Sequence, residues 1–249
     1  MVASMWTDDG NQWDGLKLRN PPGTNLCYLN TALNCLGLNS KLKLLFNNEC
    51  RGLEEQSKSS ILNEIKNLFL LNGQIGDASK LRELLHKKFH RFEQGEQNDA
   101  ADAFLSMLEC VKGTENLCRF GLHVIQTCEE CGLEKSKVDR NQWGMLLGDG
   151  SVEGKTLQNA VDEWVSKVST VECNCSCKGS NTKHREVFEI IQTPDVLHIK
   201  VKDRGGMTRN IDIADKFILN NSEYVLNSGM LYEGSRNCGH CHCSAQNKI

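Results

Sequence analysis

One cysteine near the start of the chain and one histidine near its end have the types and surroundings of a nucleophile and a base. Cys27 follows a loop rich in proline and glycine and precedes leucines at helical spacing, so we expect it at the N-terminus of a helix that Thr24 or Asn25 caps. The positive end of a helix dipole favours the thiolate, which is the form of cysteine that attacks a carbonyl. His240 follows Gly239, and a flexible glycine there would let the imidazole take the thiol proton and later deliver it to the leaving group.

Two further groups of cysteines lie in the second half of the chain. The first is a Cys-x-x-Cys pair, Cys128 and Cys131, and the second is a run of three alternating cysteines, Cys173, Cys175 and Cys177. Cysteines two residues apart in a tight turn are typical ligands of a tetrahedral, structural zinc ion. We therefore predict one zinc ion, held by the first pair and by two of the later three cysteines. The sequence does not indicate which two of those three bind the ion. Free thiols on a hairpin are the alternative.

A third group, close to the end of the sequence, mixes cysteines with histidines. Its members are Cys238, His240, Cys241, His242 and Cys243. By residue type this group has metal-ligand chemistry of its own. An alternative hypothesis is therefore a zinc scaffold for protein interactions, in which this group holds a second ion and His240 is not free for catalysis.

The pattern of apolar residues divides the chain into a helical half and a β half. Helical spacing predicts helices at 60–71, at 78–89 behind a cap at Asp77, at 97–111, and after a cap at Thr156. Short β-like runs between Gly-rich turns occupy 122–127, 187–191, 196–201 and 224–227. A helical half followed by a β half indicates the α+β class, with a site in a cleft between the halves.

Composition excludes several classes of protein. The chain has 249 residues, of which 39% are hydrophobic and 24% charged, with a net charge of -3, and these values are ordinary for a globular protein. Lys and Arg are scattered, so no nucleic-acid partner is expected, and no apolar run suits a secretory signal or a membrane span. We expect a monomer in the cytoplasm and/or nucleus, where the 13 cysteines stay reduced. Residues 1–19 are expected to form a polar N-terminal leader.

Four segments of the chain resemble, in order, motifs of the ubiquitin-specific proteases. Residues 25–36 resemble the Cys box, Gly-Asn-Thr-Cys-Tyr-Met/Leu-Asn-Ser followed by Leu-Gln-x-Leu, with Cys27 at the nucleophile position. Residues 97–108 resemble the family's Gln-Gln-Asp-Ala-x-Glu-Phe-Leu helix, and residues 188–200 resemble its strand pair Leu-Pro-x-Val-Leu-x-Ile-x-Leu-Lys. Residues 224–245 resemble the His box, Tyr-x-Leu followed by Gly-His-Tyr-x-Ala. A nucleophile near the start and a base near the end is the order found in papain-like folds.

The resemblance implies a papain-like cysteine peptidase fold of the ubiquitin-specific protease type over residues 20–249. Its parts would be a helical thumb, zinc-ribbon fingers at approximately 120–190, and an antiparallel palm sheet that is incomplete at the C-terminus. The implied activity is thiol-dependent hydrolysis of isopeptide or peptide bonds at the C-terminal glycine of ubiquitin, through a Cys27 thioester with His240 as base. The implied partners are ubiquitin or a ubiquitin-like modifier and ubiquitinated proteins.

The resemblance also implies roles for residues around the nucleophile. In the family an Asn five residues before the nucleophile supports the oxyanion hole, with a hydrogen bond worth roughly 3 kcal/mol in the transition state. Pro22 stands at that position and has no donor, so Asn20 or Asn25 would have to substitute. The positions that would contact the tail of the modifier are Gln97, Asp99 and Gly239.

The third catalytic residue of the family has no clear counterpart in the sequence. In relatives an Asp or Asn downstream of the histidine orients the imidazole, whereas here no Asp follows Asp215, and Asn247 is the one later candidate. We expect a fragment or a weakly active member, because loss of an orienting residue slows turnover without abolishing it. The alternatives are a catalytically impaired pseudo-protease that binds ubiquitin or another partner, and a viral-type papain-like protease with a similar ribbon.

Overall fold

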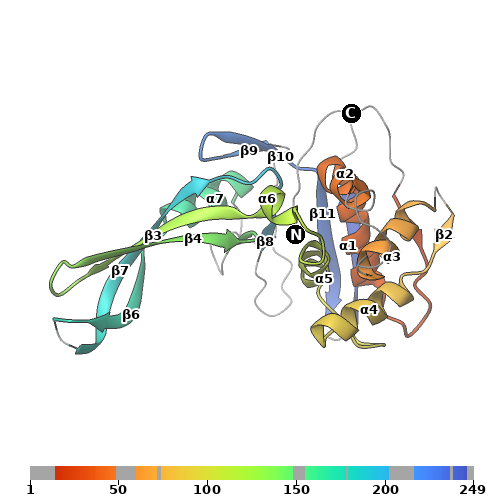
Figure 1. The fold of residues 1–249 in the computed structure, drawn as a ribbon, viewed down its shortest axis with the longest axis horizontal. Helices are drawn as coiled ribbons and strands as arrows, with labels where there is room; N and C mark the ends of the chain where they lie inside the picture. Colours follow the sequence, from red (N-terminus) through yellow and green to blue (C-terminus); the bar gives the residue numbers. More distant parts are fainter. Residues whose placement is uncertain are drawn as a thin grey trace.

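The computed structural model is an elongated molecule (Figure 1). The structure describes residues 15–48, 60–71, 74–147, 155–177, 179–201, 216–235 and 238–245. The helices of the N-terminal half gather at one end, and a long sheet projects toward the other (Figure 1). Most of the leader predicted at 1–19 lies outside the described residues, which begin at Gly15.

The helical end is built around α1. Its elements are α1 (Cys27–Leu38), α2 (Ser40–Asn48), α3 (Ser60–Phe69), α4 (Ser79–Phe89), α5 (Ala100–Leu108) and α6 (Thr114–Cys118), with a short parallel pair of β1 (Lys17–Leu18) and β2 (Ile75–Gly76). Leu29, Leu33 and Leu36, the apolar positions that predict α1, each have 0% exposure. α2 and α6 are additional to the helices that the sequence predicts. Among the described residues, none of the helices combines the length and the apolar character that a bilayer crossing requires.

The projecting part is a four-stranded antiparallel sheet in the order β4-β3-β7-β6. Its strands are β3 (Phe120–Cys128), β4 (Glu134–Gln142), β6 (Ser169–Cys175) and β7 (Gly179–Gln192). The strands form two hairpins, β3–β4 and β6–β7, and β3 pairs with β7 so that Cys128 lies opposite His184. The two hairpin turns therefore meet at the same end of the sheet.

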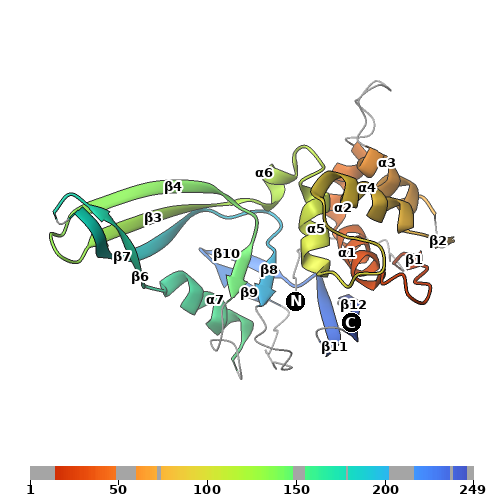
Figure 2. The ribbon, with the colours of Figure 1, turned by 90° about the horizontal axis from the view of Figure 1, so that it is seen from below.

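Three smaller strand pairs complete the described β structure. β5 (Met145–Leu147) pairs in parallel with β8 (Ile199–Val201), β9 (Lys216–Leu219) pairs with β10 (Ser222–Val225), and β11 (Ser228–Ser235) pairs with β12 (Cys238–Ala245). The β11–β12 hairpin packs along α1, as both views show (Figures 1 and 2). α7 (Leu157–Ser166) begins at Thr156, whose Oγ1 accepts the Asn159 N–H at 3.2 Å, so the predicted cap is confirmed.

Buried apolar side chains form two clusters among the described residues. The first surrounds α1 and includes Met230 of β11 and Cys241 of β12. The second joins β3, β5, α7 and β8–β10, with the Trp164 ring contacting the rings of Phe120 and Phe188. The two elements that carry the predicted nucleophile and base, α1 and β12, thus pack in the same cluster.

β4 lies at one edge of the projecting sheet and is exposed along nearly its whole length. Its sequence is Glu-Lys-Ser-Lys-Val-Asp-Arg-Asn-Gln, so charged side chains stand on both of its faces. Val138 is its one apolar residue and is 54% exposed. Because β4 has no alternation of apolar and polar residues, the sequence pattern does not predict it.

Candidate active site and thiol cluster

Cys27 is the first residue of α1, as the sequence predicts. Its side chain is 5% exposed and belongs to the cluster around α1. The N-cap residue is Leu26, and no side chain makes a capping hydrogen bond, so the caps predicted at Thr24 and Asn25 are wrong. Instead Asn20 Oδ1 accepts the Leu26 N–H at 2.9 Å. The loop before the helix is thus fixed by an asparagine six residues upstream of the N-cap.

Asn20 and Asn25, the two amides considered for an oxyanion hole, are placed differently. Asn25 has a left-handed φ of 50°, which asparagine tolerates better than most residues. Its Nδ2 donates to the Gly95 carbonyl at 2.6 Å, and this nitrogen is the donor that an oxyanion would need. The bond from Asn20 to Leu26 uses the Asn20 oxygen. Of the two, Asn20 is therefore the one whose described bond does not engage its amide nitrogen.

Gln97 contacts the nucleophile directly. Its Nε2 donates to Cys27 Sγ at 3.8 Å, although 70 residues separate the two in the sequence. The segment that resembles the family's second motif therefore reaches the thiol, as the resemblance implies for a residue at the active site.

β12 presents a cysteine, and not the predicted histidine, to Cys27. The Cys241 thiol lies beside the Cys27 thiol, and burial together with this neighbour raises the pKa of Cys241 to about 12. Two residues further along the same face of β12, Cys243 Sγ lies 3.1 Å from Cys35 Sγ of α1. The inner face of β12 is thus lined by thiols that meet thiols of α1.

His240 lies on the opposite face of β12 from Cys241, because successive side chains of a strand alternate. Its side chain is exposed, and among the described residues no contact joins it to Cys27. Gly239 precedes it in β12, opposite Gly234 of β11. The structure therefore brings the backbone of the predicted base next to the nucleophile but turns the imidazole outward.

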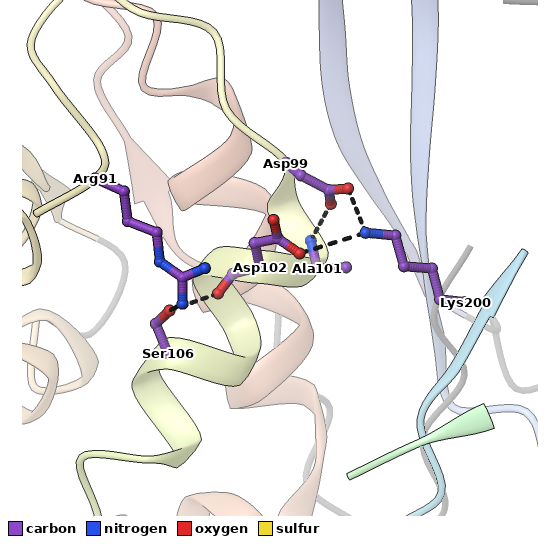
Figure 3. Close-up of polar contacts among 6 residues, drawn as sticks. All are labelled: Arg91, Asp99, Ala101, Asp102, Ser106 and Lys200. Carbon is purple, nitrogen blue, oxygen red and sulfur yellow. Dashed lines mark hydrogen bonds and ion pairs between the residues drawn. The ribbon is translucent and has the colours of Figure 1, made fainter. Parts of the chain in front are cut away.

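Asp99 forms the N-cap of α5 and an ion pair across to β8 (Figure 3). Its Oδ1 accepts the Ala101 N–H at 2.7 Å, and its Oδ2 lies 2.6 Å from Lys200 Nζ. Lys200 also lies 3.3 Å from Asp102 Oδ1. Because α5 belongs to the first apolar cluster and β8 to the second, this lysine bridges the two.

The ion pair shifts the protonation of both partners. Burial acts to raise the pKa of Asp99, but the Lys200 ammonium and the N–H groups of Ala101 and Asp102 outweigh it and hold the pKa below its usual range. Burial acts to lower the pKa of Lys200, but the carboxylates of Asp99 and Asp102 raise it above its usual range. Both partners are therefore charged at neutral pH.

α5 is held from two further directions. Arg91 Nη2 donates to Ser106 Oγ at 2.9 Å on the side away from Lys200 (Figure 3). The Phe104 ring stacks on the imidazole of His198, with 5.8 Å between ring centroids. Burial lowers the pKa of His198 to about 3, so this histidine is a neutral core residue.

Four of the five cysteines predicted as metal ligands come together at the turns of the two hairpins. They are Cys128 and Cys131 from the β3–β4 turn, and Cys175 and Cys177 from the β6–β7 turn. Their sulfur atoms all lie within 4.8 Å of one another, with 3.8 Å between Cys128 and Cys177 and 3.6 Å between Cys131 and Cys175. A tetrahedral zinc with bonds of about 2.3 Å would space its sulfurs about 3.8 Å apart. The side chain of Cys173 lies outside the described residues.

Buried polar atoms beside this thiol cluster also fit an ion. His184, opposite Cys128 in the ladder, has 0% exposure, and within the described part of the chain neither of its ring nitrogens has a hydrogen-bond partner. Thr182 Oγ1, on the same face of β7, is buried and lacks a partner as well. Buried donors without partners are costly, and sulfurs carrying the negative charge of a zinc-thiolate centre would accept hydrogen bonds from them.

Comparison with known proteins identifies the family. The model of the ubiquitin carboxyl-terminal hydrolase family matches residues 18–248. The chain belongs to this family. A chain in the structure of the SAGA DUB module Ubp8/Sgf11/Sus1/Sgf73 bound to monoubiquitin is similar, with a TM-score of 0.68 and 15% sequence identity. The match covers 91% of the present chain and 60% of the other. No curated protein matches the sequence.

This ubiquitin carboxyl-terminal hydrolase family member has the papain-like α+β fold that the sequence predicts. The present chain spans about 60% of the length of the similar chain in the DUB module. The helical part around α1 corresponds to the predicted thumb, and the projecting sheet to the predicted fingers.

Sequence reasoning missed two features of this hydrolase family member. The ion pair of Lys200 with Asp99 joins residues 101 positions apart, and in the sequence Lys200 is simply a polar position in a strand. The contact of Cys35 with Cys243 joins residues 208 positions apart. The sequence contained an indication of this contact, because cysteines at positions 241 and 243 must share one face of a strand.

Proposed function

We propose that this chain is a cysteine-type deubiquitinase with Cys27 as nucleophile. The observation that carries the proposal is the position of a buried thiol at the N-terminus of α1, in contact with Gln97 and packed against β12, in a member of the ubiquitin carboxyl-terminal hydrolase family. Free backbone N–H groups at a helix N-terminus favour a thiolate and can stabilise the oxyanion that forms when it attacks a carbonyl.

The proposed reaction proceeds in two steps. Cys27 attacks the carbonyl carbon of the C-terminal glycine of the modifier, the amine of the target leaves with a proton, and a thioester remains; water then releases the modifier. Asn20 and Gln97 are the amides best placed to donate to the oxyanion. We assign proton transfer to His240, which requires a rearrangement of β12 that turns the imidazole toward Cys27 and moves Cys241 away.

The substrate is proposed to be ubiquitin or a ubiquitin-like modifier attached to another protein. Support comes from the family and from the monoubiquitin bound in the similar DUB module. Asp99 lies two residues after Gln97, which contacts Cys27, and its carboxylate is proposed to receive a basic residue of the modifier's tail. Such a residue would compete with Lys200, which lies 2.6 Å from that carboxylate.

The thiol cluster is proposed to hold one structural zinc ion. Its ligands would be Cys128, Cys131, Cys175 and Cys177, whose sulfur spacing suits a tetrahedral ion. The ion would join the turns of the two hairpins and add folding free energy, and it would take no part in the chemistry at Cys27. A reducing compartment, the cytoplasm or the nucleus, suits a protein with so many thiols.

A ubiquitin probe with an electrophile at its C-terminus tests the proposed function. The full chain is incubated with the probe, and mass spectrometry maps the labelled cysteine. We expect labelling at Cys27, its loss in Cys27→Ala and a strong reduction in His240→Gln. Cys118→Ala is the matched control, because Cys118 is a buried cysteine of the same apolar cluster.

Two other results would contradict the proposal. Tight binding of the probe without labelling indicates a pseudo-protease that retains only ubiquitin recognition. Absence of both binding and labelling in a folded chain removes ubiquitin as the substrate. Labelling that is unchanged in His240→Gln would refute the role given to His240 alone.

A further inference from the structure

The interface between α1 and β12 is lined by paired thiols. Cys35 Sγ and Cys243 Sγ lie 3.1 Å apart, and the Cys241 thiol lies beside Cys27. Cys35 has 1% exposure, whereas Cys243 is only partly buried. Cys241 and Cys243, two of the C-terminal cysteines that the sequence suggests as metal ligands, thus lie beside thiols of the helix.

The two sulfurs of the Cys35–Cys243 pair are already in contact, at 3.1 Å. A disulfide has a sulfur–sulfur bond of about 2.05 Å, so these sulfurs would have to approach by about 1 Å. β12 packs against α1 through Cys241 and Cys243, so a small movement of the two side chains would supply that approach without separating the elements.

We propose that Cys35 and Cys243 form a redox modification site, which closes to a disulfide when the protein meets an oxidant of the peroxide class and reopens with a thiol reductant. Bond formation rests on the contact between the two sulfurs and not on the proposed function.

The partly buried thiol reacts first. The Cys243 thiolate attacks one oxygen of hydrogen peroxide, the O–O bond breaks, and Cys243 sulfenic acid and water form. Cys35 is shielded, and its hydrogen bond to Cys243 together with burial holds its pKa well above the usual range. It therefore reacts second: its sulfur gives up its proton and attacks the sulfenic sulfur, and the S–O bond breaks. In total two thiols and one peroxide give one disulfide and two waters.

Closure of this bond has a consequence for the proposed activity, and this part of the inference rests on the proposed function. Cys243 and His240 lie on the same strand, three residues apart. A bond from Cys243 to α1 would fix β12 with Cys241 against Cys27 and His240 turned outward. The oxidised protein would then be unable to make the rearrangement that brings the imidazole to the nucleophile.

Peptide mapping of the oxidised full chain tests the site. The protein is treated with hydrogen peroxide under native conditions, alkylated, and digested without reductant. We expect a linked peptide pair that joins Cys35 to Cys243 and lacks two hydrogens, and that disappears with dithiothreitol. Cys35→Ser and Cys243→Ser should abolish it, whereas Cys118→Ser, at a buried cysteine of the same cluster, should leave it intact.

The inference is overturned if peroxide converts Cys243 to a sulfinic acid, or joins it to another cysteine, while Cys35 stays fully available to alkylation after unfolding.

Labelling of Cys27 by the ubiquitin probe provides the second measurement. In Cys35→Ser the disulfide cannot form, so any loss of labelling in this variant measures direct oxidation of Cys27. Peroxide should reduce labelling more in the wild type than in Cys35→Ser. Equal reduction in the two proteins would refute the effect on activity. No labelling of the reduced wild type would instead refute the proposed function, and the peptide map would still decide the disulfide.

Discussion

Asp99 serves at once as a helix cap and as an ion-pair partner, and two substitutions separate these contributions. Asp99→Asn removes the charge but keeps a side-chain oxygen that can accept the Ala101 N–H, as Asp99 does at 2.7 Å. Asp99→Ala removes both. Because α5 places Gln97 near Cys27, the stability of this helix start also bears on the active site.

The expected magnitudes follow from distance and exposure. Unit charges 2.6 Å apart, as for Asp99 and Lys200, attract by about 1.6 kcal/mol in water. The side chains are 44% and 34% exposed, so screening and side-chain ordering reduce this to about 0.5–1 kcal/mol. A lost cap costs about 1 kcal/mol. We therefore expect Asp99→Asn to lower the free energy of unfolding by about 0.5–1 kcal/mol and Asp99→Ala by about 1.5–2 kcal/mol.

Urea unfolding of the single and double variants provides the assay. In a Lys200→Met background Asp99→Asn should hardly change the free energy of unfolding, because the Asp99 charge has already lost its main partner. Asp99→Ala should still lower the free energy of unfolding in that background, because it also removes the helix cap. Glu93→Gln, at an exposed carboxylate in the preceding loop, is the control and should be neutral. Equal costs for the Asn and Ala variants, or an Asn cost unaffected by Lys200→Met, would refute this reasoning.

Three further predictions concern the core, pH and metal. Leu33→Ala, at a position with 0% exposure, should lower the free energy of unfolding by about 2.7–5 kcal/mol, whereas Leu44→Ala, at 61% exposure, should change it by less than about 0.5 kcal/mol in urea titrations. The pKa of Asp99 is depressed on folding, so its stabilisation should be complete above about pH 4 and lost as pH falls through the folded-state pKa. The pKa of Lys200 is raised, so its stabilisation should be complete below about pH 10.4 and lost as pH rises further. In Lys200→Met, unfolding curves across pH should lose the dependence at high pH and show a weaker one at low pH, because the N–H groups of Ala101 and Asp102 still favour the Asp99 carboxylate. Zinc chelation, or Cys128→Ser, should lower Tm, and added zinc should restore it in the chelated wild type but not in the variant; an unchanged Tm would contradict a structural ion.

The sequence predicts most of the fold because local patterns decide it. Leucines at helical spacing predict α1, and Thr156 predicts the start of α7, since both depend on residues within a few positions. β4 escapes prediction because an edge strand exposed on both faces needs no apolar alternation. α6 escapes because its five residues are too few to show a period.

The candidate site is predictable only as far as it depends on neighbours in the sequence. The placement of Cys27 at a helix start follows from the loop before it, and the Cys128–Cys131 pair follows from its spacing. Pairing of Cys175 and Cys177 with them depends on the register between β3 and β7, which the spacing of cysteines does not fix. The outward direction of His240 depends on which residues of β12 face α1, and a shift by one residue would reverse it.

The charged edge formed by β4 bears on how this molecule behaves when crowded. A long ribbon that extends from a compact body has unpaired backbone N–H and C=O groups along its outer strand, and such groups invite another chain to add a strand of its own. Lysines, an arginine and acidic residues on β4 oppose this, because charged side chains on an edge strand would have to lose water when another strand is added. Replacing these charges by threonine or valine would leave the chain folded but prone to assemble edge to edge.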